Sequence, residues 1–263
     1  MPILGIIASQ ISGHLVAPTS PVAGYNVWLD AADTGTITVS GTAVTQWTDK
    51  SANAYAFAQG TSAQRPASGT ETQNGKNVMV YANSNLLSTA ASSVWKYLSD
   101  GSLYTVMIAC KTSTTNAEQY LLSNYSGSGG SIGISFGSEA TNRLEYIVFR
   151  NVSGAVAVGN STDNNTLGTS FTYVSALMDP SNGTAANRSD IRLKQGAAVK
   201  NNTTTNAVNT GNPFSALRIG DYTTGSNTSA WYGQIGEILI YPSLLSSGNL
   251  LLNQQYLAAK WGV

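Results

Sequence analysis

The segment Ser131-Ile132-Gly133-Ile134-Ser135-Phe136-Gly137 alternates small or polar residues with large apolar ones. Successive side chains of a strand point to opposite faces, so this alternation buries one face and lines the other with small residues. Turn-forming segments such as Ser126-Gly127-Ser128-Gly129-Gly130 separate it from its neighbours. Further strands are expected at residues 25–30, 44–48, 77–81, 103–111, 143–150, 171–179, 190–194, 216–220 and 234–241. Short strands with such turns indicate an all-β sandwich of two antiparallel sheets.

Two further elements are expected beside these strands. The segment 103–111 is apolar on both faces, which indicates a central strand with one face in the core and the other partly covered. A C-terminal helix is predicted over residues 249–261, capped by one of the two serines before it and followed by Gly262. Leu250, Leu257 and Trp261 fall on one stripe of this helix. A shorter helix or turn is expected around residues 92–99.

The N-terminal segment differs from the rest of the chain. Residues 1–20 are closed by the stretch Pro18-Thr19-Ser20-Pro21, and two prolines within four residues favour an extended linker. The segment is apolar but lacks the positive region of a secretory signal, so we expect a docking arm that covers its apolar residues against a partner or its own domain. Those residues are Ile3, Leu4, Ile6, Ile7 and Ile11. Residues 24–263 show no second change of composition and are interpreted as one β-sandwich domain.

The amino-acid composition argues against several classes of function. The 263 residues include 13 Lys+Arg and 13 Asp+Glu, so the formal net charge is zero, and only 10% of residues are charged. Serine (32), threonine (28) and asparagine (23) carry the polarity instead. This balance argues against nucleic-acid binding, which needs basic residues to neutralise phosphates. No window reaches the roughly 18 apolar residues of a membrane span. The single cysteine, Cys110, excludes a disulfide within the chain and ends an apolar run, so a buried position is expected.

The sequence offers little for metal or nucleophilic catalysis. His14 is the only histidine and lies in the arm, which excludes a His-rich metal site and makes a Ser-His-Asp triad implausible. Calcium stays open because it needs only oxygen ligands, but no dense Asp-x-Asp cluster supports it. We therefore expect no cofactor and no metal site.

Glycoside hydrolysis needs two carboxylates about 5–9 Å apart. Glu145 and Glu237 lie on predicted strands and are the first candidates for such a pair. However, no two acids stand at positions i and i+2 of a predicted strand, the simplest way to place both on one face. Surface or salt-bridged glutamates are therefore the preferred interpretation, and we expect no catalytic residue.

Loops rich in Asn, Ser, Thr, Gly and Tyr suit neutral polar ligands such as glycans, because aromatic faces stack on sugar rings and amides bond hydroxyl groups. The loop at residues 221–232 has this chemistry. Its candidate glycan-binding residues are Tyr222, Asn227, Trp231 and Tyr232. The alternative is that Trp231 and Tyr232 anchor the loop to the core.

Four parts of the sequence carry a resemblance to a known family. Gly24–Asp33 contains a W-x-D-A-x-D pattern, and residues 44–53 match V-x-x-W-x-D-K-S-G-N with Ala52 in place of the usual glycine. Residues 217–220 and 233–241 resemble terminal L-x-I-G and G-x-I-x-E-I-x-I-Y strands, and residues 256–262 resemble a closing Y-L-A-x-K-W-G helix. Together they resemble the concanavalin A-like, or laminin G-like, jelly-roll domain of tailed-phage and bacterial surface proteins.

The resemblance implies mainly structural roles for the motif residues. Three tryptophans are expected in the core, two aspartates are expected to tie loops through backbone N–H groups, and a glutamate in the last strand is expected to make a structural bond. These residues are Trp28, Trp47, Trp261, Asp30, Asp49 and Glu237. The E-x-D-x-x-E or E-x-D-x-E signature of the family's glucanases is absent, which argues against hydrolase activity.

Residues 1–13 are similar to the N-terminus of predicted phage structural proteins that carry such domains. This resemblance implies a non-catalytic protein of the virion surface, docked on the capsid as a decoration protein or head fibre, or on the tail. Its expected partners are other virion proteins, further copies of itself and host-surface glycans. Two alternatives stay open: a receptor-binding lectin module of the tail, and a polysaccharide-cleaving enzyme that uses Glu145 and Glu237.

Overall fold

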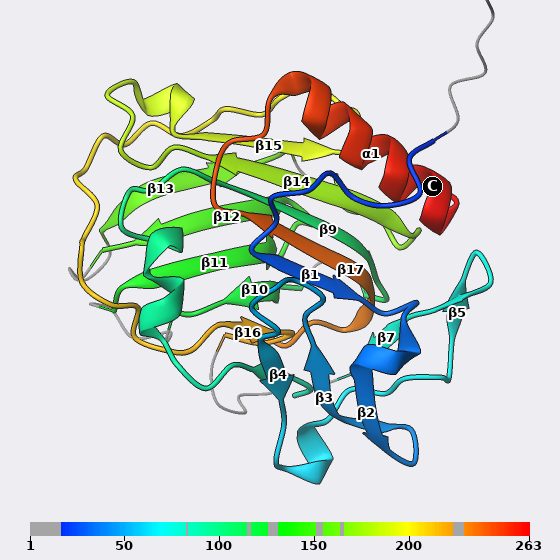
Figure 1. Ribbon diagram of the computed structural model, residues 1–263. Coiled ribbons are helices and arrows are strands. Elements are labelled where there is room, and N and C mark those ends of the chain that lie inside the picture. The colour runs from blue at the N-terminus through cyan, green and yellow to red at the C-terminus, as the bar shows by residue number, and fades with distance from the viewer. Residues whose placement is uncertain are drawn as a thin grey trace, which may run out of the picture.

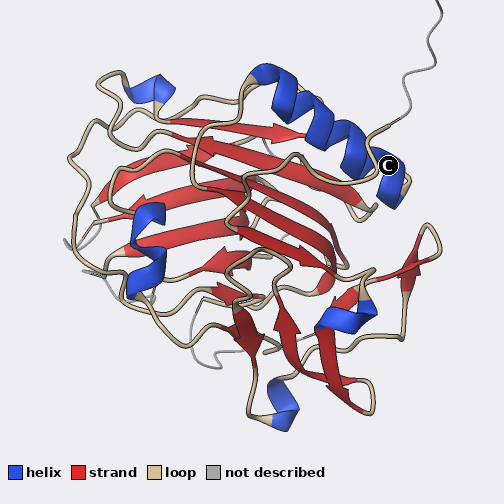
Figure 2. Ribbon diagram, in the orientation of Figure 1, coloured by secondary structure: helices blue, strands red, loops and turns tan. Residues whose placement is uncertain are grey.

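The computed structural model of the protein describes residues 17–82, 84–114, 117–125, 131–150, 155–163, 166–222 and 229–263. The five apolar residues of the predicted docking arm and the candidate glycan-binding residue Asn227 lie outside the described residues. Those arm residues are Ile3, Leu4, Ile6, Ile7 and Ile11. The described residues form mostly antiparallel β-structure with one α-helix near the C-terminus (Figures 1 and 2).

The strands form two main sheets. The six-stranded sheet has the order β1 (Val27–Asp30), β17 (Gly233–Tyr241), β9 (Tyr104–Thr112), β14 (Thr172–Met178) and β15 (Ser189–Leu193), with β7 (Met79–Tyr81) also paired to β17. The nine-stranded sheet has the order β13 (Val156–Ser161), β12 (Leu144–Phe149), β11 (Gly133–Ser138), β10 (Gln119–Ser123), β16 (Arg218–Ile219), β8 (Leu87–Ser88), β4 (Ala56–Ala58), β3 (Ala43–Thr48) and β2 (Ile37–Ser40). A small ribbon joins β5 (Thr72–Gln73) to β6 (Lys76–Asn77).

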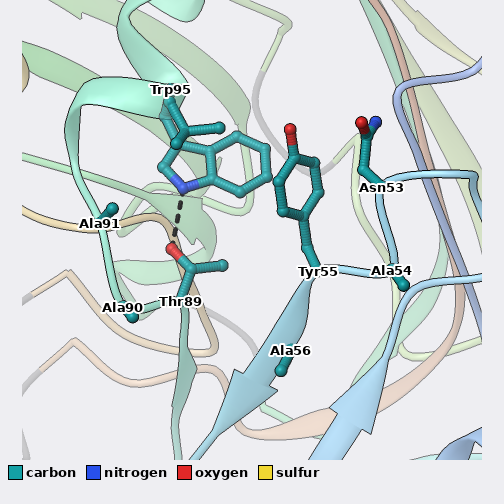
Figure 3. A pocket seen from close by; sticks show the side chains of 9 residues that line it. Asn53, Ala54, Tyr55, Ala56, Thr89, Ala90, Ala91 and Trp95 are labelled. Atoms are coloured by element: carbon teal, nitrogen blue, oxygen red, sulfur yellow. Dashed lines mark hydrogen bonds between the residues drawn. The ribbon is translucent and has the colours of Figure 1, made fainter.

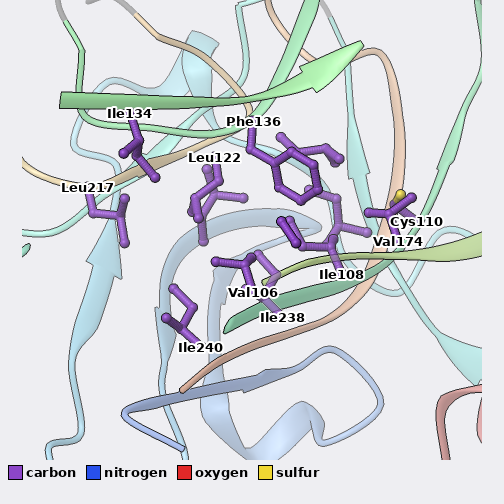
Figure 4. Close-up of a cluster of buried hydrophobic side chains, with 14 of the residues drawn as sticks. Val106, Ile108, Cys110, Leu122, Ile134, Phe136, Val174, Leu217, Ile238 and Ile240 are labelled. Atoms are coloured by element: carbon purple, nitrogen blue, oxygen red, sulfur yellow. The ribbon is translucent and has the colours of Figure 1, made fainter. Parts of the chain in front are cut away.

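The main core lies between the two large sheets. Ile134 and Phe136 of β11 face Ile108 of β9, Val174 of β14 and Ile238 of β17 in one buried cluster (Figure 4). Cys110 lies in the same cluster, where burial raises the pKa of its thiol to about 12. The alternating pattern of the sequence therefore produces the inward face that it predicts, and the two-sheet antiparallel sandwich is confirmed.

The six-stranded sheet has a second apolar face, which α1 (Ser247–Trp261) covers. Met107 of β9 and Leu239 of β17 point to this face and pack in one cluster with Leu250, Leu257 and Trp261 of the helix. This second layer explains why the central strands are apolar on both faces. The side chain of Ser246 accepts a hydrogen bond from the N–H of residue 249, and the helix ends where Gly262 adopts the left-handed conformation.

A buried carboxylate ties the helix to the sheet. Glu237 on β17 has no exposed surface, and it accepts hydrogen bonds from Trp28 Nε1 at 2.7 Å, Tyr256 Oη at 2.7 Å and Trp261 Nε1 at 3.0 Å. Lys260 Nζ lies 2.8 Å from its Oε2. Burial raises the pKa of Glu237, while the charge of Lys260 acts in the opposite direction. These four partners give Glu237 a structural place between sheet and helix.

The aspartates of the first two motifs also make local structural bonds. Asp49 accepts from the backbone N–H of Trp28 at 2.7 Å and of Ser51 at 2.8 Å, and Asp30 pairs with Lys260 at 2.6 Å. Trp47 and Trp261 are fully buried. Trp28, by contrast, is only partly buried. Its ring packs against the second cluster, and Lys50 Nζ lies 4.2 Å from the ring centroid.

The shorter elements include four 3-10 helices. They are η1 (Thr34–Thr36), η2 (Ser62–Gln64), η3 (Ser93–Leu98) and η4 (Ala185–Asn187), and η3 occupies the segment where a short helix or turn is expected. Five strands of the nine-stranded sheet have no counterpart among the strands expected from the sequence: β2, β4, β8, β10 and β13. All five are short, so only pairing with a neighbouring strand distinguishes them from loops.

Candidate functional site

Side chains of β12 in the nine-stranded sheet alternate between buried and partly exposed positions. On β12, Leu144 and Tyr146 are buried in the core, while Glu145, Ile147 and Phe149 are partly exposed and face away from it. Since alternate residues of a strand share a face, these three side chains lie together on the outer face. This face is opposite the core, whereas the outer face of the six-stranded sheet is covered by α1.

A pocket of about 350 Å³ lies on this outer face. Its aromatic lining consists of Tyr120, Tyr125, Phe149 and Tyr222. Its acidic lining consists of Glu118, Glu139 and Glu145, and Ile147 completes it. An aromatic surface with a few polar groups in a concave site is typical of small-ligand binding sites.

Strand β11, which carries the alternating segment, also shapes this pocket. In the register of the sheet, Tyr120 of β10 stands opposite Gly137 of β11, and Gly137 stands opposite Glu145 of β12. Residues directly opposite each other share a face, so the three lie in one row across the sheet. Gly137 places no side chain between the ring and the carboxylate. A Cβ atom there would lie 1.9 Å from the carbonyl oxygen of Gln119, so β10 can approach this closely only because residue 137 is glycine.

The aromatic rings of the pocket contact one another. The rings of Tyr125 and Phe149 stack with centroids 3.6 Å apart and planes 7° apart. Tyr222 lies near both tyrosines, with ring centroids 4.7 Å from Tyr120 and 6.5 Å from Tyr125. Arg218 Nη1 donates a 2.8 Å hydrogen bond to the carbonyl oxygen of Tyr222 and so fixes the backbone at that position.

The three carboxylates have different surroundings. Glu118 accepts a hydrogen bond from the hydroxyl group of Tyr120, and Glu139 forms an ion pair with Arg143. Burial raises the pKa of Glu145; the positive charge of Arg143 opposes this shift and the negative charge of Glu118 adds to it. One pocket therefore holds a partly buried carboxyl group with a raised pKa beside two further carboxyl groups, an arrangement that suits proton donation from Glu145.

The loop residues predicted to bind glycans are separated by the structure. Tyr222 lines the pocket. Trp231 has no exposed surface and lies in the main core, so its prediction as a sugar-stacking face is wrong and the alternative, a core anchor, describes it. Tyr232 is 38% exposed but does not line the pocket. Its backbone N–H donates to Gln119 Oε1 at 2.9 Å.

The predicted carboxylate pair is not assembled. Glu145 lies on the nine-stranded sheet and faces away from the core, whereas Glu237 lies on the six-stranded sheet beneath α1. The residues that do accompany Glu145 come from β10 and from segments next to β10, β11 and β16. Period-two spacing places Phe149 on the same face of the strand as Glu145. The proximity of Glu145 to Tyr120 and Tyr125 depends on strand pairing, which cannot be predicted from this sequence.

A second pocket, of about 270 Å³, lies beside η3 (Figure 3). The rings of Tyr55 and Trp95 are 4.8 Å apart between centroids, and Trp95 Nε1 donates to Thr89 Oγ1 at 2.8 Å. Four alanines contribute to the lining, and Trp95 is almost wholly buried. Because the indole N–H of Trp95 is already bonded, this pocket offers a polar ligand fewer hydrogen-bond partners than the pocket around Glu145.

Two classes of site find no support in the part of the chain that is described. Those residues contain no cluster of three or more His, Cys, Asp or Glu side chains that could hold a metal ion. Among them there is also no helix of the length and apolarity needed to cross a membrane.

Comparison with known proteins identifies similar folds rather than similar sequences. No protein-family model matches the sequence, and a search of curated proteins finds no match. Among solved structures, a Trypanosoma rangeli sialidase in complex with 2,3-difluorosialic acid is similar over 97% of this chain and 36% of its own, with a TM-score of 0.59 and 12% identity. An arabinofuranosidase complexed with arabinofuranosyl-alpha-1,2-xylobiose is similar over 83% of this chain and 51% of its own, with a TM-score of 0.55 and 12% identity.

These similarities show a shared β-sandwich fold. The chain spans about a third of the length of the sialidase that it matches. The expectation of a protein that is not an enzyme is contradicted, because the solved structures that match most of this chain include a sialidase and an arabinofuranosidase. Nothing in the comparisons indicates a virion protein.

Proposed function

We propose that this protein binds glycans in the pocket on the outer face of the nine-stranded sheet. The observation that carries the proposal is the combination, in one pocket, of the stacked rings of Tyr125 and Phe149 with the carboxylates of Glu118 and Glu145. An aromatic face matches the apolar C–H face of a sugar ring, and a carboxylate accepts hydrogen bonds from sugar hydroxyl groups. The carbohydrate-active proteins that share the fold support this proposal.

The test is a glycan array on the folded protein, followed by calorimetric titration of the glycans that bind. Tyr125→Ala and Phe149→Ala each remove one ring of the stack, and we expect each to weaken binding about tenfold, the loss of roughly 1.4 kcal/mol. Tyr232→Ala is the matched control, because it removes an exposed tyrosine that does not line the pocket. Equal losses in all three variants would show that binding occurs elsewhere.

A second candidate function is cleavage of a glycosidic bond in the same pocket. The observation that favours it is the position of Glu145, which lines the pocket with Glu118 and Glu139 and whose pKa is raised by burial, with the charge of Glu118 adding to the shift. In this reaction Glu145 gives its proton to the departing glycosidic oxygen, while a second carboxylate stabilises the developing positive charge or activates water.

Cleavage is tested by measuring reducing ends released from the glycans that bind. Loss of release in Glu145→Gln with retained binding would support hydrolysis, because glutamine keeps the size of the side chain but holds no acidic proton. Glu71→Gln is the control, since Glu71 bonds Gln234 at the other sheet. Binding without any release by the unaltered protein would reduce the function to recognition.

A further inference from the structure

The pocket is lined by acidic groups that few cations balance. Of the residues that the structure describes, three glutamates line it and no lysine or arginine does. Arg143 is held in an ion pair with Glu139. Among the described residues, neither Glu118 nor Glu145 forms an ion pair with a lysine or arginine, although Arg143 is near enough to Glu145 to influence its pKa. The part of the pocket next to Tyr120 is therefore negatively charged whenever these two groups are ionised.

The carboxylate of Glu145 is placed where it can interact with a ligand bound in the pocket. Glu145 is partly buried on β12, between Gly137 of β11 and Ser161 of β13, so its neighbours in the sheet are too small to cover it. Its carboxylate accepts no hydrogen bond from the described residues, in contrast to Glu237, which has four partners. Charges interact more strongly in a partly desolvated pocket than in bulk water. A ligand stacked on Tyr125 and Phe149 meets this field directly.

From the aromatic pocket and its unbalanced carboxylates we infer that the site selects sugars by charge: it rejects anionic sugars such as sialic acid and prefers amino sugars with a free ammonium group over neutral ones. This inference rests on the proposed function and names the ligand class of that site. A sugar carboxylate in the pocket faces like charges, which is unfavourable unless a cation intervenes. A sugar ammonium instead makes charge-assisted hydrogen bonds to the same groups. The sialidase that shares this fold was solved with a sialic acid derivative, so the two proteins differ in the ligand expected.

The experiment compares three oligosaccharides of similar size by calorimetry on the full chain. They are a trimer of N-acetylglucosamine, which is neutral, the deacetylated glucosamine trimer at a pH where its amines are protonated, and 3′-sialyllactose, which is anionic. At low salt we expect the deacetylated trimer to bind at least about tenfold more tightly than the neutral one, and no binding of sialyllactose. The advantage is expected to shrink as salt rises, because ions screen exposed charges beyond roughly 10 Å at 0.1 M.

Variants assign the selectivity to the pocket. In the double variant Glu118→Gln with Glu145→Gln, the ratio of affinities for the deacetylated and neutral trimers is expected to fall towards one. Glu71→Gln removes the same kind of charge at a different place and is expected to keep the ratio. Circular dichroism and the unfolding midpoint establish that each variant is folded, so a lost ratio is not a lost fold.

The outcomes separate this inference from the function on which it rests. Binding of sialyllactose as tight as that of the neutral trimer, or an ammonium preference that survives the double variant, overturns the charge inference and leaves glycan binding standing. Binding of neutral glycans with no preference for the amine also overturns it. Binding of no glycan, neither in the array nor among the three probes, removes the proposed function and the inference together.

Discussion

Glu145 on β12 stands directly opposite Gly137 on β11, so the carboxylate projects beside a position that has no side chain. On the other side of Gly137 stands Tyr120 of β10. Neighbouring strands are about 4.8 Å apart, so the tyrosine and the glutamate are separated by roughly two strand spacings with only backbone between them. The gap above Gly137 lies on the outer face of the sheet, and Tyr120 and Glu145 on either side of it line the pocket.

Gly137→Ala tests this close approach. The added Cβ would lie 1.9 Å from the carbonyl oxygen of Gln119, so β10 and β11 must separate, and we expect a loss of about 1–3 kcal/mol in the free energy of unfolding. Urea unfolding measures it. Gly183→Ala is the matched control, because a Cβ there meets no atom within 4 Å. Equal stability of the two variants would contradict the register described for these strands.

Glu237→Leu tests the tie between α1 and the six-stranded sheet. The substitution removes a fully buried acceptor and leaves Lys260 and two indole N–H groups without it, so we expect about 3–5 kcal/mol of destabilisation. Chemical denaturation gives the value, with Glu71→Leu as the comparison at an exposed position. A loss below 1 kcal/mol would show that the helix is held by its apolar contacts alone.

Trp231→Ala separates a core residue from a ligand-binding one. Because Trp231 is fully buried, we expect about 3–5 kcal/mol of destabilisation from the cavity that the substitution leaves. Thermal unfolding followed by fluorescence and circular dichroism measures it. Unchanged stability together with lost glycan binding would return Trp231 to the binding site and contradict its burial.

The pH dependence of stability tests the environment of Glu145. Its pKa is raised in the folded state, chiefly by burial and further by Glu118, with Arg143 opposing; the nearby Glu139 is paired with Arg143. The folded state therefore holds the proton more tightly than the unfolded state. Stability from this group is present below its usual pKa of 4.5 and is lost as pH rises through the raised value.

Glu145→Gln removes this titration. We expect the variant to gain stability relative to the unaltered protein when the pH is raised from 4 to 7, as measured by urea midpoints at both values. Glu71→Gln corrects for the change in net charge. A difference between variant and unaltered protein that stays constant over this range would mean that Glu145 titrates as a freely solvated group.

Much of the fold could be predicted from the sequence, because several elements show patterns within short stretches of the chain. The alternation at residues 131–137, the doubly apolar strand at 103–111 and the capped helix before Gly262 each express a periodicity within a few residues of chain. The structure confirms all three. The strands β2, β4, β8, β10 and β13 were not predicted, because each is short and only pairing with a partner defines it as a strand.

Only parts of the candidate site could be predicted from the sequence. Residue pattern alone predicts that the chain makes a β-sandwich, that Glu145 lies on a strand and that Tyr222 lies in an aromatic, polar loop. Only the folded chain shows that Glu145 lines a pocket with Tyr120, Tyr125 and Tyr222 rather than with Glu237, and that Trp231 is buried. This difference arises because the alternation of side chains involves neighbouring residues of one strand. The register between strands is instead fixed by hydrogen bonds and close packing between residues far apart in the chain.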